Sequence, residues 1–252
     1  MRTLITGASS GIGRDMAREM ASKGYDLVLV ARNQEGLDKI KEELLEKYSN
    51  IGIQTFALDL AKQENCYKLY EQAKDIDILI NNAGFGLFGK FEDTDLDKEL
   101  NMVDTNIKAV HILTKLYLKD MLKKDSGHIL NVASIAGFMP GPLMATYYAS
   151  KNYIVALTRA IHKEIKKQNL KVKISLLCPG PVDTNFNNVA DVKFKIPGLT
   201  SEYVAKYAIK NMLKGKLIIV PGKLIKVTRV LSEVTPTVLT EEISYHMQRR
   251  KQ

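Results

Sequence analysis

The sequence predicts an α/β fold, a single domain in which helices cover both faces of a doubly wound parallel sheet of about seven strands. Short runs rich in Val, Ile and Leu alternate with longer helical patterns along the 252 residues. Several of these runs are apolar at successive positions, as expected for strands that have helices on both faces. No internal repeat and no linker rich in Pro, Gly or Ser divides the chain. One domain spanning residues 1–252 is therefore expected.

The expected strands and helices follow one another in order. Strands are expected at residues 2–6, 26–31, 51–58, 76–81, 128–134, 171–178 and 216–220. Helical patterns lie at residues 12–23, 35–48, 62–74, 97–123, 145–168 and 201–214. This order implies right-handed crossovers between parallel strands. Residues 179–200 show little patterning and follow the sixth strand, at the edge where such sheets bind ligands, so we expect a substrate loop there.

Composition indicates an ordinary folded protein. Apolar residues make up 45% of the chain and charged residues 26%. With only two cysteines, Cys66 and Cys178, neither a disulfide framework nor a metal cluster is expected. No apolar run approaches the ~18 residues of a membrane span, and we expect no leader before the first strand. We therefore expect a soluble, cytoplasmic protein without stable membrane association.

The net charge of +9 arises from 37 basic and 28 acidic residues. Many lysines stand beside acids at helical spacing, as in residues 38–47, which predicts solvated helix faces. No basic segment is interleaved with aromatic residues, so a nucleic-acid partner is not expected. The positive charge favours an anionic small molecule instead.

A glycine-rich turn, TGASSGIG, occupies residues 6–13 between the first expected strand and the first expected helix. Backbone N–H groups and the positive end of the helix can face a phosphate there, because no Cβ stands in the way. Gly7 permits the tight exit from the strand, Gly11 the close approach of a pyrophosphate, and Gly13 the packing of helix against sheet. A flexible loop is the alternative, but the strand before the turn and the helix after it favour a phosphate site.

A tyrosine and a lysine share a helical face in YYASK, residues 147–151. Tyr147 lies four residues before Lys151 and Tyr148 three residues before it, so either phenol can face the ammonium. A phenol has an ordinary pKa near ~10, and an adjacent cation lowers it by favouring the phenolate. The pair could serve as a proton shuttle, or it could be part of an ordinary amphipathic surface.

The glycine spacing resembles the TGxxxGxG turn of the short-chain dehydrogenase/reductase family, in its single-domain, NADP-preferring branch. The family's YxxxK motif matches Tyr147 and Lys151, its strand-end serine matches Ser134, and its catalytic asparagine matches Asn106. This resemblance implies a Rossmann-like fold. It also implies that Tyr147 exchanges a proton with the substrate oxygen and that Ser134 hydrogen-bonds the same oxygen. Lys151 would hold the nicotinamide ribose and tune the tyrosine, and Asn106 would position a water for proton resupply.

The cofactor that the resemblance implies is NADP(H), with no metal. Arg32 stands after the second strand, where an acidic residue would bind the ribose of NAD. A cation there suits the 2′-phosphate of NADP, with Arg14 and Lys39 as secondary candidates. The alternative for Arg32 is a solvated residue at the start of a helix. The full set of expected cofactor-binding residues is Gly7, Ser9, Ser10, Gly11, Ile12, Gly13, Arg32, Asp59, Leu60, Asn82, Ala83, Gly84, Tyr147, Lys151, Pro179, Gly180, Val182 and Thr184.

These features together favour an NADP(H)-dependent carbonyl reductase, reversible as an alcohol dehydrogenase, with Tyr147 as general acid and base. The alternatives are a catalytically silent nucleotide-binding or scaffold protein on the same fold, or a 3-ketoacyl or hydroxysteroid specialist. The long helical patterns at residues 97–123 and 145–168 resemble those that pair subunits in the family, so a homodimer or homotetramer is expected. An apolar pocket for a ketone or aldehyde is expected from Phe85, Phe88, Ile135, Met139, Met144, Phe186 and Val189.

The end of the chain departs from the family pattern. Many members close the last strand with a VDGG-like turn, whereas residues 216–227 read KLIIVPGKLIKV and a helical extension, residues 223–252, follows. This ending makes a soluble 3-oxoacyl-thioester reductase of the fatty-acid type less expected. We expect two helices, separated at Pro236, that pack over the pocket or against a second subunit; a basic amphipathic helix on an anionic membrane is the alternative. Their apolar stripes are Leu224, Val227, Leu231 and Val234, then Leu239, Ile243 and Met247.

Overall fold

The computed structural model describes residues 1–184, 186, 190 and 198–249. The side chains of Thr237 and Met247 fall outside this description. Val189 and much of the expected substrate loop also lie outside the described residues, so what was predicted for them stays a prediction.

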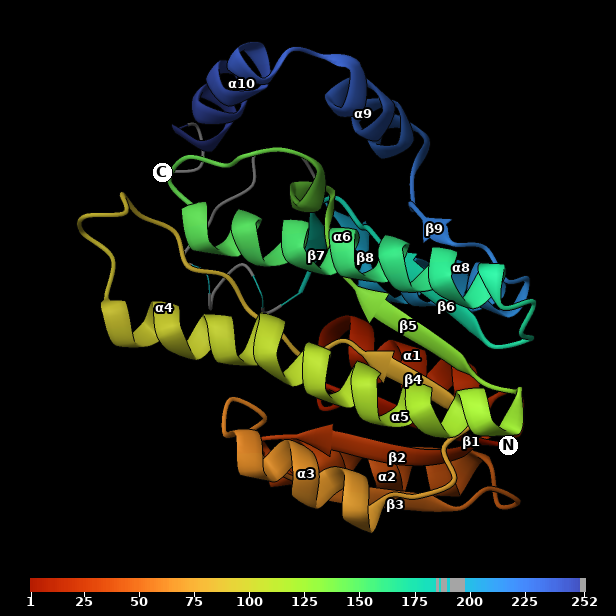
Figure 1. The fold of residues 1–252 in the computed structure, drawn as a ribbon. Helices are drawn as coiled ribbons and strands as arrows, with labels where there is room; N and C mark the ends of the chain where they lie inside the picture. The colour runs from red at the N-terminus through yellow and green to blue at the C-terminus, as the bar shows by residue number, and fades with distance from the viewer. Residues whose placement is uncertain (185, 187–189, 191–197, 250–252) are drawn as a thin grey trace.

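Seven parallel strands form the central sheet, in the order β3-β2-β1-β4-β5-β6-β9 (Figure 1). The chain starts in the middle of the sheet, builds outward through β2 to β3, and then crosses to β4 on the other side of β1. The connections that leave β1 and β4 therefore run in opposite directions, which opens a crevice at the carboxyl ends of these strands. The predicted α/β fold is confirmed. The strands are β1 (Arg2–Thr6), β2 (Asp26–Ala31), β3 (Ile53–Ala57), β4 (Ile78–Asn81), β5 (His128–Val132), β6 (Lys173–Leu177) and β9 (Ile218–Ile219).

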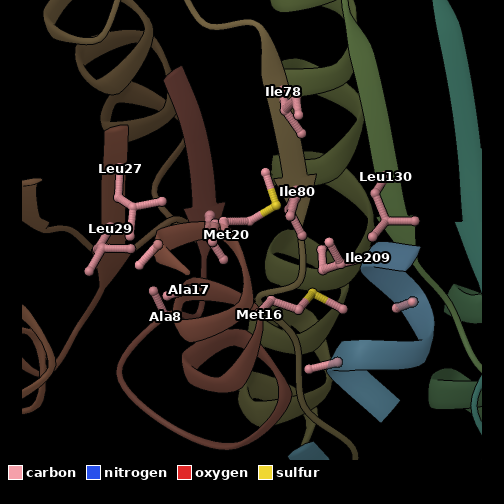
Figure 2. Close-up of a cluster of buried hydrophobic side chains, with 14 of the residues drawn as sticks. Ala8, Met16, Ala17, Met20, Leu27, Leu29, Ile78, Ile80, Leu130 and Ile209 are labelled. Carbon is pink, nitrogen blue, oxygen red and sulfur yellow. The ribbon is translucent and has the colours of Figure 1, made fainter. Parts of the chain in front are cut away.

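Successive strand residues enter separate hydrophobic cores on the two faces of the sheet. Ile5 packs in the core under three helices, and its neighbour Leu4 packs in the core on the opposite face. Figure 2 shows Met16 and Met20 of the first helix inserted between the strands and Ile209 of a later helix. One face is covered by α1 (Gly11–Ala21), α2 (Gln34–Lys47) and α8 (Ser201–Leu213), and the other by α3 (Gln63–Gln72), α5 (Val110–Lys124) and α6 (Ala145–Lys167).

Three local features are absent from the sequence prediction. The helix expected at residues 97–123 is divided into α4 (Leu96–Val103), a π-helical turn η1 (Asp104–Ala109) and α5. A 3-10 turn, η2 (Ile135–Phe138), follows β5. Two short parallel strands, β7 (Val182–Asp183) and β8 (Leu199–Thr200), pair at the two ends of the segment expected to be a loop.

The chain ends in α9 (Lys223–Val234) and α10 (Thr237–Arg249), which separate at Pro236 as expected. They lie outermost in the molecule, above α6 in the view of Figure 1. Their apolar stripes are exposed on this chain and do not pack over the pocket, since Leu224 is 69% exposed and Val234 is 73% exposed. Packing of the stripes against a second subunit stays a prediction. Among the described residues, the helices contact the body through Ile225, Arg229 and Glu233 of α9 and through Ser244 and Gln248 of α10. In the part of the chain that the structure describes, no helix has the length and hydropathy needed to cross a membrane.

Candidate active site

A cleft of about 540 Å³ opens at the carboxyl ends of the sheet strands. It is lined by the glycine turn, by the segments that follow β2, β3, β4, β5 and β6, and by the first turns of α6. Of the site residues predicted from sequence, all line this cleft except Gly13 and Asn106. Those two lie directly behind its wall, as described below.

The turn that follows β1 contains glycines, so no side chain covers its backbone at these positions. Gly7 has a φ of +66°, a conformation that side chains other than glycine rarely adopt. A Cβ on Gly13 would stand 2.2 Å from the carbonyl oxygen of Gly7, so α1 can approach the turn only without a side chain at this position. Ser10, the N-cap of α1, makes no side-chain capping bond, and the first turn of α1 contains no acidic residue. The N–H groups at this helix end are therefore available to an anionic ligand.

Thr6 joins the glycine turn to the segment after β4. Its Oγ1 accepts hydrogen bonds from the backbone N–H of Asn82 at 2.9 Å and of Ala83 at 3.0 Å. The Nδ2 of Asn82 donates in return to the Thr6 carbonyl at 3.0 Å. These hydrogen bonds fix the position of the glycine turn relative to the segment after β4. The sequence prediction missed Thr6 as a positioning residue, although its place at the end of the first strand, beside the glycines, was a usable signal.

Arg32 follows β2 and lines the cleft with an exposed side chain. Within the described ranges, no carboxylate pairs with its guanidinium. The two secondary candidates behave differently, because Arg14 pairs with Asp15 at 3.2 Å and Lys39 pairs with Glu35 at 2.5 Å. Neither of these two residues lines the cleft. Arg32 thus supplies a positive charge at the end of the cleft next to the glycine turn; Asp95 and Asp97 line a second cavity with it, but neither is within ion-pair distance.

Tyr147 lies in the first turn of α6, facing Ser134 at the end of β5. Burial raises the pKa of the Tyr147 phenol above its ordinary value, and the hydrogen bond with Ser134 opposes this rise. The expectation that Lys151 lowers this pKa is wrong for the protein alone. The cost of desolvating a phenolate exceeds the stabilisation that the neighbouring groups provide.

Lys151 lies one turn further along α6 and is 6% exposed. Its Nζ donates to the carbonyl oxygen of Val132 at 3.1 Å and lies 5.7 Å from the centroid of the Tyr147 ring. Burial lowers the pKa of Lys151 to about 8. This ammonium therefore titrates close to neutral pH.

Asn106 is fully buried in the π-helical turn η1, which widens the helix locally. Its Oδ1 accepts from the backbone N–H of Phe85 at 3.1 Å, and its Nδ2 donates to the Phe85 carbonyl at 2.8 Å and to Ser150 Oγ at 3.2 Å. A Cβ on Gly84 would lie 2.8 Å from Asn106 Oδ1 and 3.5 Å from Lys151 Nζ. Asn106 thus braces the cleft wall from behind, next to the lysine.

The other side of the cleft is apolar. Met144 and Tyr148 are buried in one cluster, and the rings of Tyr147 and Phe186 lie 5.5 Å apart. Of the predicted pocket residues, Phe85, Ile135, Met144 and Phe186 line the cleft, whereas Phe88 and Met139 pack against the cluster from outside its lining.

Tyr148 lies at this apolar side and connects it to the end of the chain. Its hydroxyl accepts a hydrogen bond from Gln248 Nε2 of α10, and burial raises its pKa to about 12. Its ring would stand 2.2 Å from a Cβ on Gly141. Tyr148 is therefore a fixed part of the pocket wall.

No cluster of metal-ligating side chains occurs among the residues that the structure describes. The polar groups of the cleft are hydroxyls, amides, backbone N–H groups and cations, a set suited to an anionic nucleotide.

Comparison with known proteins agrees with this arrangement. Residues 2–193 match the family model of the short chain dehydrogenases. The very-long-chain 3-oxoacyl-CoA reductase of Anas platyrhynchos is 33% identical over 215 residues, covering 82% of this chain and 67% of the duck protein.

Two solved structures share the fold. A short-chain dehydrogenase from Sphingobium yanoikuyae in complex with NADPH superposes with a TM-score of 0.83 at 24% identity, covering 93% of this chain and 96% of that one. A short chain dehydrogenase/reductase from Burkholderia phymatum in complex with NAD superposes with a TM-score of 0.82 at 25% identity, covering 91% of this chain and 92% of that one. The sequence match to the family model, the sheet order and the cleft together show that this chain is an oxidoreductase of the short-chain dehydrogenase family.

Proposed function

We propose that this protein is an NADP(H)-dependent oxidoreductase that interconverts carbonyl compounds and secondary alcohols. The observation that carries the proposal is the meeting of Tyr147, Ser134 and Lys151 in one cleft with the glycine turn. The bare backbone at Gly7 and Gly13 and the uncapped start of α1 fit the pyrophosphate of a dinucleotide. When bound, NADPH supplies the hydride, and NADP accepts one in the opposite direction.

The proton transfers belong to the side chains. Tyr147 donates its phenolic proton to the substrate oxygen during reduction and receives one during oxidation. Ser134 Oγ hydrogen-bonds the same oxygen and stabilises the negative charge that develops there. In reduction the carbonyl carbon gains the hydride and the oxygen gains the proton, so one secondary alcohol forms for each proton consumed. The raised pKa of Tyr147 keeps the phenol protonated, which is the form that reduction requires.

Lys151 and Asn106 support this step. We assign Lys151 to hold the nicotinamide ribose and to stabilise the tyrosinate left after proton donation, because its Nζ is 5.7 Å from the Tyr147 ring. Asn106 keeps the wall at Gly84 in place and is assigned to position a water that returns the proton through Lys151.

The choice of NADP over NAD depends on Arg32. Its unpaired guanidinium at the glycine-turn end of the cleft suits a 2′-phosphate, with which it can form charge-assisted hydrogen bonds. The two similar structures contain NADPH in one case and NAD in the other, so the residue after β2 carries the assignment.

A 3-oxoacyl thioester is a second substrate candidate within the same chemistry. The apolar wall formed by Met144, Tyr148 and Phe186 suits an aliphatic chain, and the name of the duck relative indicates this substrate class for that protein. The altered chain end speaks against the soluble fatty-acid type only. A panel should therefore pair bulky apolar ketones with 3-oxoacyl thioesters of increasing length.

Binding of NADPH and NADH by calorimetry, followed by turnover of this panel, tests the proposal. We expect Tyr147→Phe to lower kcat/KM by about 10³ while cofactor binding is retained. Tyr148→Phe is the matched control, because it removes a neighbouring hydroxyl and should keep turnover. An active Tyr147→Phe variant would overturn the catalytic assignment. Tight cofactor binding without turnover in the unaltered protein would favour the catalytically silent alternative.

We also propose a homodimer or homotetramer that pairs through residues 97–123 and 145–168, which form α4, η1, α5 and α6. Light scattering of the purified protein tests it, and a monomer at micromolar concentration would contradict it.

A further inference from the structure

Helices α9 and α10 contact the protein through Ile225 and through several polar side chains. On α9, the Arg229 guanidinium lies 5.3 Å from the centre of the Phe138 ring and donates to Glu233 at 2.8 Å. Glu233 also accepts from Arg159 of α6 at 3.4 Å. Helix α9 is thus attached to the body by the ion pair with Arg159, by the contact of Arg229 with Phe138 and by the packing of Ile225.

The described buried side chains of helix α10 are polar and uncharged. Ser244 is fully buried and Gln248 is 1% exposed. Gln248 donates to the hydroxyl of Tyr148 in the wall of the cleft. The buried face of α10 is therefore polar, and it touches the apolar side of the candidate active site.

The opposite faces of both helices are apolar and exposed. An amphipathic helix on a protein surface ordinarily shows the reverse arrangement, with its apolar stripe toward the core. Contiguous exposed aliphatic surface of this kind marks an interaction site. We call this set of side chains the C-terminal apolar face; it consists of Leu224, Val227, Val230, Leu231 and Val234 of α9 and Val238, Leu239 and Ile243 of α10, which are 52–78% exposed.

The charges around the C-terminal apolar face indicate what covers it. Lys223 and Lys226 are exposed at the start of α9, and the sequence continues after α10 in Arg250 and Lys251. The acids of these helices are Glu233, which pairs with Arg229 of α9, and the exposed Glu241 and Glu242 of α10. An aliphatic face bordered by lysines is complementary to an anionic lipid surface.

We propose that the C-terminal apolar face is a docking surface for an anionic lipid membrane. The helices of 12 and 13 residues are too short to span a bilayer, so they would lie in its interface. The contact is weak and reversible, consistent with the expected absence of stable membrane association. Because α10 contacts Tyr148, docking brings the apolar side of the cleft near the lipid.

Co-sedimentation of the full chain with vesicles tests the proposal. The probes are vesicles of phosphatidylcholine alone and of phosphatidylcholine with about one quarter phosphatidylglycerol. We expect binding to the anionic vesicles, weakened at about 0.5 M salt, and little binding to the neutral ones. The double variant Leu224→Asp, Leu231→Asp should bind the anionic vesicles at least about tenfold more weakly.

The control is Leu96→Asp on α4, since Leu96 is 67% exposed and Leu224 is 69% exposed. This control should bind vesicles like the unaltered chain, and circular dichroism melting should show that all three proteins fold. Absence of vesicle binding by the folded protein overturns the proposal, as does equal binding by the double variant. Light scattering that shows the double variant, but not Leu96→Asp, losing an oligomer would assign the face to a second copy of the chain instead.

Discussion

The two sides of the cleft are built by different means. On the cofactor side, backbone packs against backbone, with Gly13 against Gly7 and the hydroxyl of Thr6 bonded to two backbone N–H groups. On the substrate side, bulky side chains such as Met144 and Phe186 form the wall, and one hydrogen bond from Gln248 connects this wall to α10. The first side tolerates almost no added atom, whereas the second can change its shape by exchanging side chains.

Gly13→Ala breaks the cofactor side and has the largest expected effect. The added methyl group would stand 2.2 Å from the Gly7 carbonyl oxygen and 2.4 Å from Asn82 Nδ2, so the turn must shift away from its phosphate-binding geometry. We expect about hundredfold weaker cofactor binding, or about 3 kcal/mol, by calorimetry. Gly52→Ala is the matched control, because its Cβ would meet only Asp26 at an ordinary 3.4 Å. Equal affinity of the two variants would show that close backbone packing does not define this side.

Arg32→Ala changes the charge of the cofactor side while leaving its backbone intact. Loss of a charge-assisted contact to the 2′-phosphate should weaken the binding of NADPH by about 30-fold and leave the binding of NADH nearly unchanged. Parallel titrations with both nucleotides measure the ratio. Arg14→Ala is the control, since Arg14 pairs with Asp15 and does not line the cleft. An equal decrease in the affinities for NADPH and NADH would mean that Arg32 does not bind the 2′-phosphate.

These differences explain what could be predicted from the sequence. Strands and helices follow from apolar periodicity, and the glycine turn is visible because only one residue type fits there. The π-helical turn at Asn106 could not be predicted, because apolar periodicity does not distinguish one π turn from the α-helix around it; the bonds of Asn106 to the Phe85 backbone join residues that are distant in sequence. The apolar stripes of α9 and α10 could be recognised in the sequence, but periodicity does not show whether a stripe faces the protein or the solvent. The direction of the Tyr147 pKa was wrong because burial is a property of the folded chain.

The pH dependence of cofactor binding tests the role of Lys151, the buried cation between the two sides of the cleft. Lys151 has a pKa of about 8 in the folded protein, below its ordinary 10.5, so it is an ammonium below pH 8 and neutral above. If the ammonium donates to the ribose, binding favours the protonated form, and affinity falls as pH rises through about 8. We expect a loss of about tenfold between pH 7 and pH 9, measured by calorimetry. Lys151→Arg, which stays charged over this range, should give a flat profile; a flat profile in the unaltered protein would contradict the assignment.

The same shift has a consequence for stability. The unfolded chain binds more protons at Lys151 than the folded chain does between pH 8 and 10.5, so this group destabilises the fold most fully below pH 8. A neutral side chain of similar length, as in Lys151→Met, should therefore unfold at a higher denaturant concentration at pH 7 while binding cofactor less well. An unchanged unfolding midpoint would mean that the bond to the Val132 carbonyl offsets the burial of the charge.

Gln248→Leu perturbs the substrate side and has the smallest expected effect. It removes the hydrogen bond from α10 to Tyr148 but keeps the volume of the buried side chain. We expect unchanged cofactor affinity, a loss of about 1 kcal/mol in the free energy of unfolding, and a change of about threefold in KM for bulky substrates. A double-mutant cycle with Tyr148→Phe separates the bond from the packing. A coupling energy of about 1 kcal/mol would show that α10 helps to shape the substrate side. A coupling energy near zero would mean that the hydrogen bond from Gln248 to Tyr148 does not help to shape the substrate side. Helix α6 and the residues before it would then form this wall without α10.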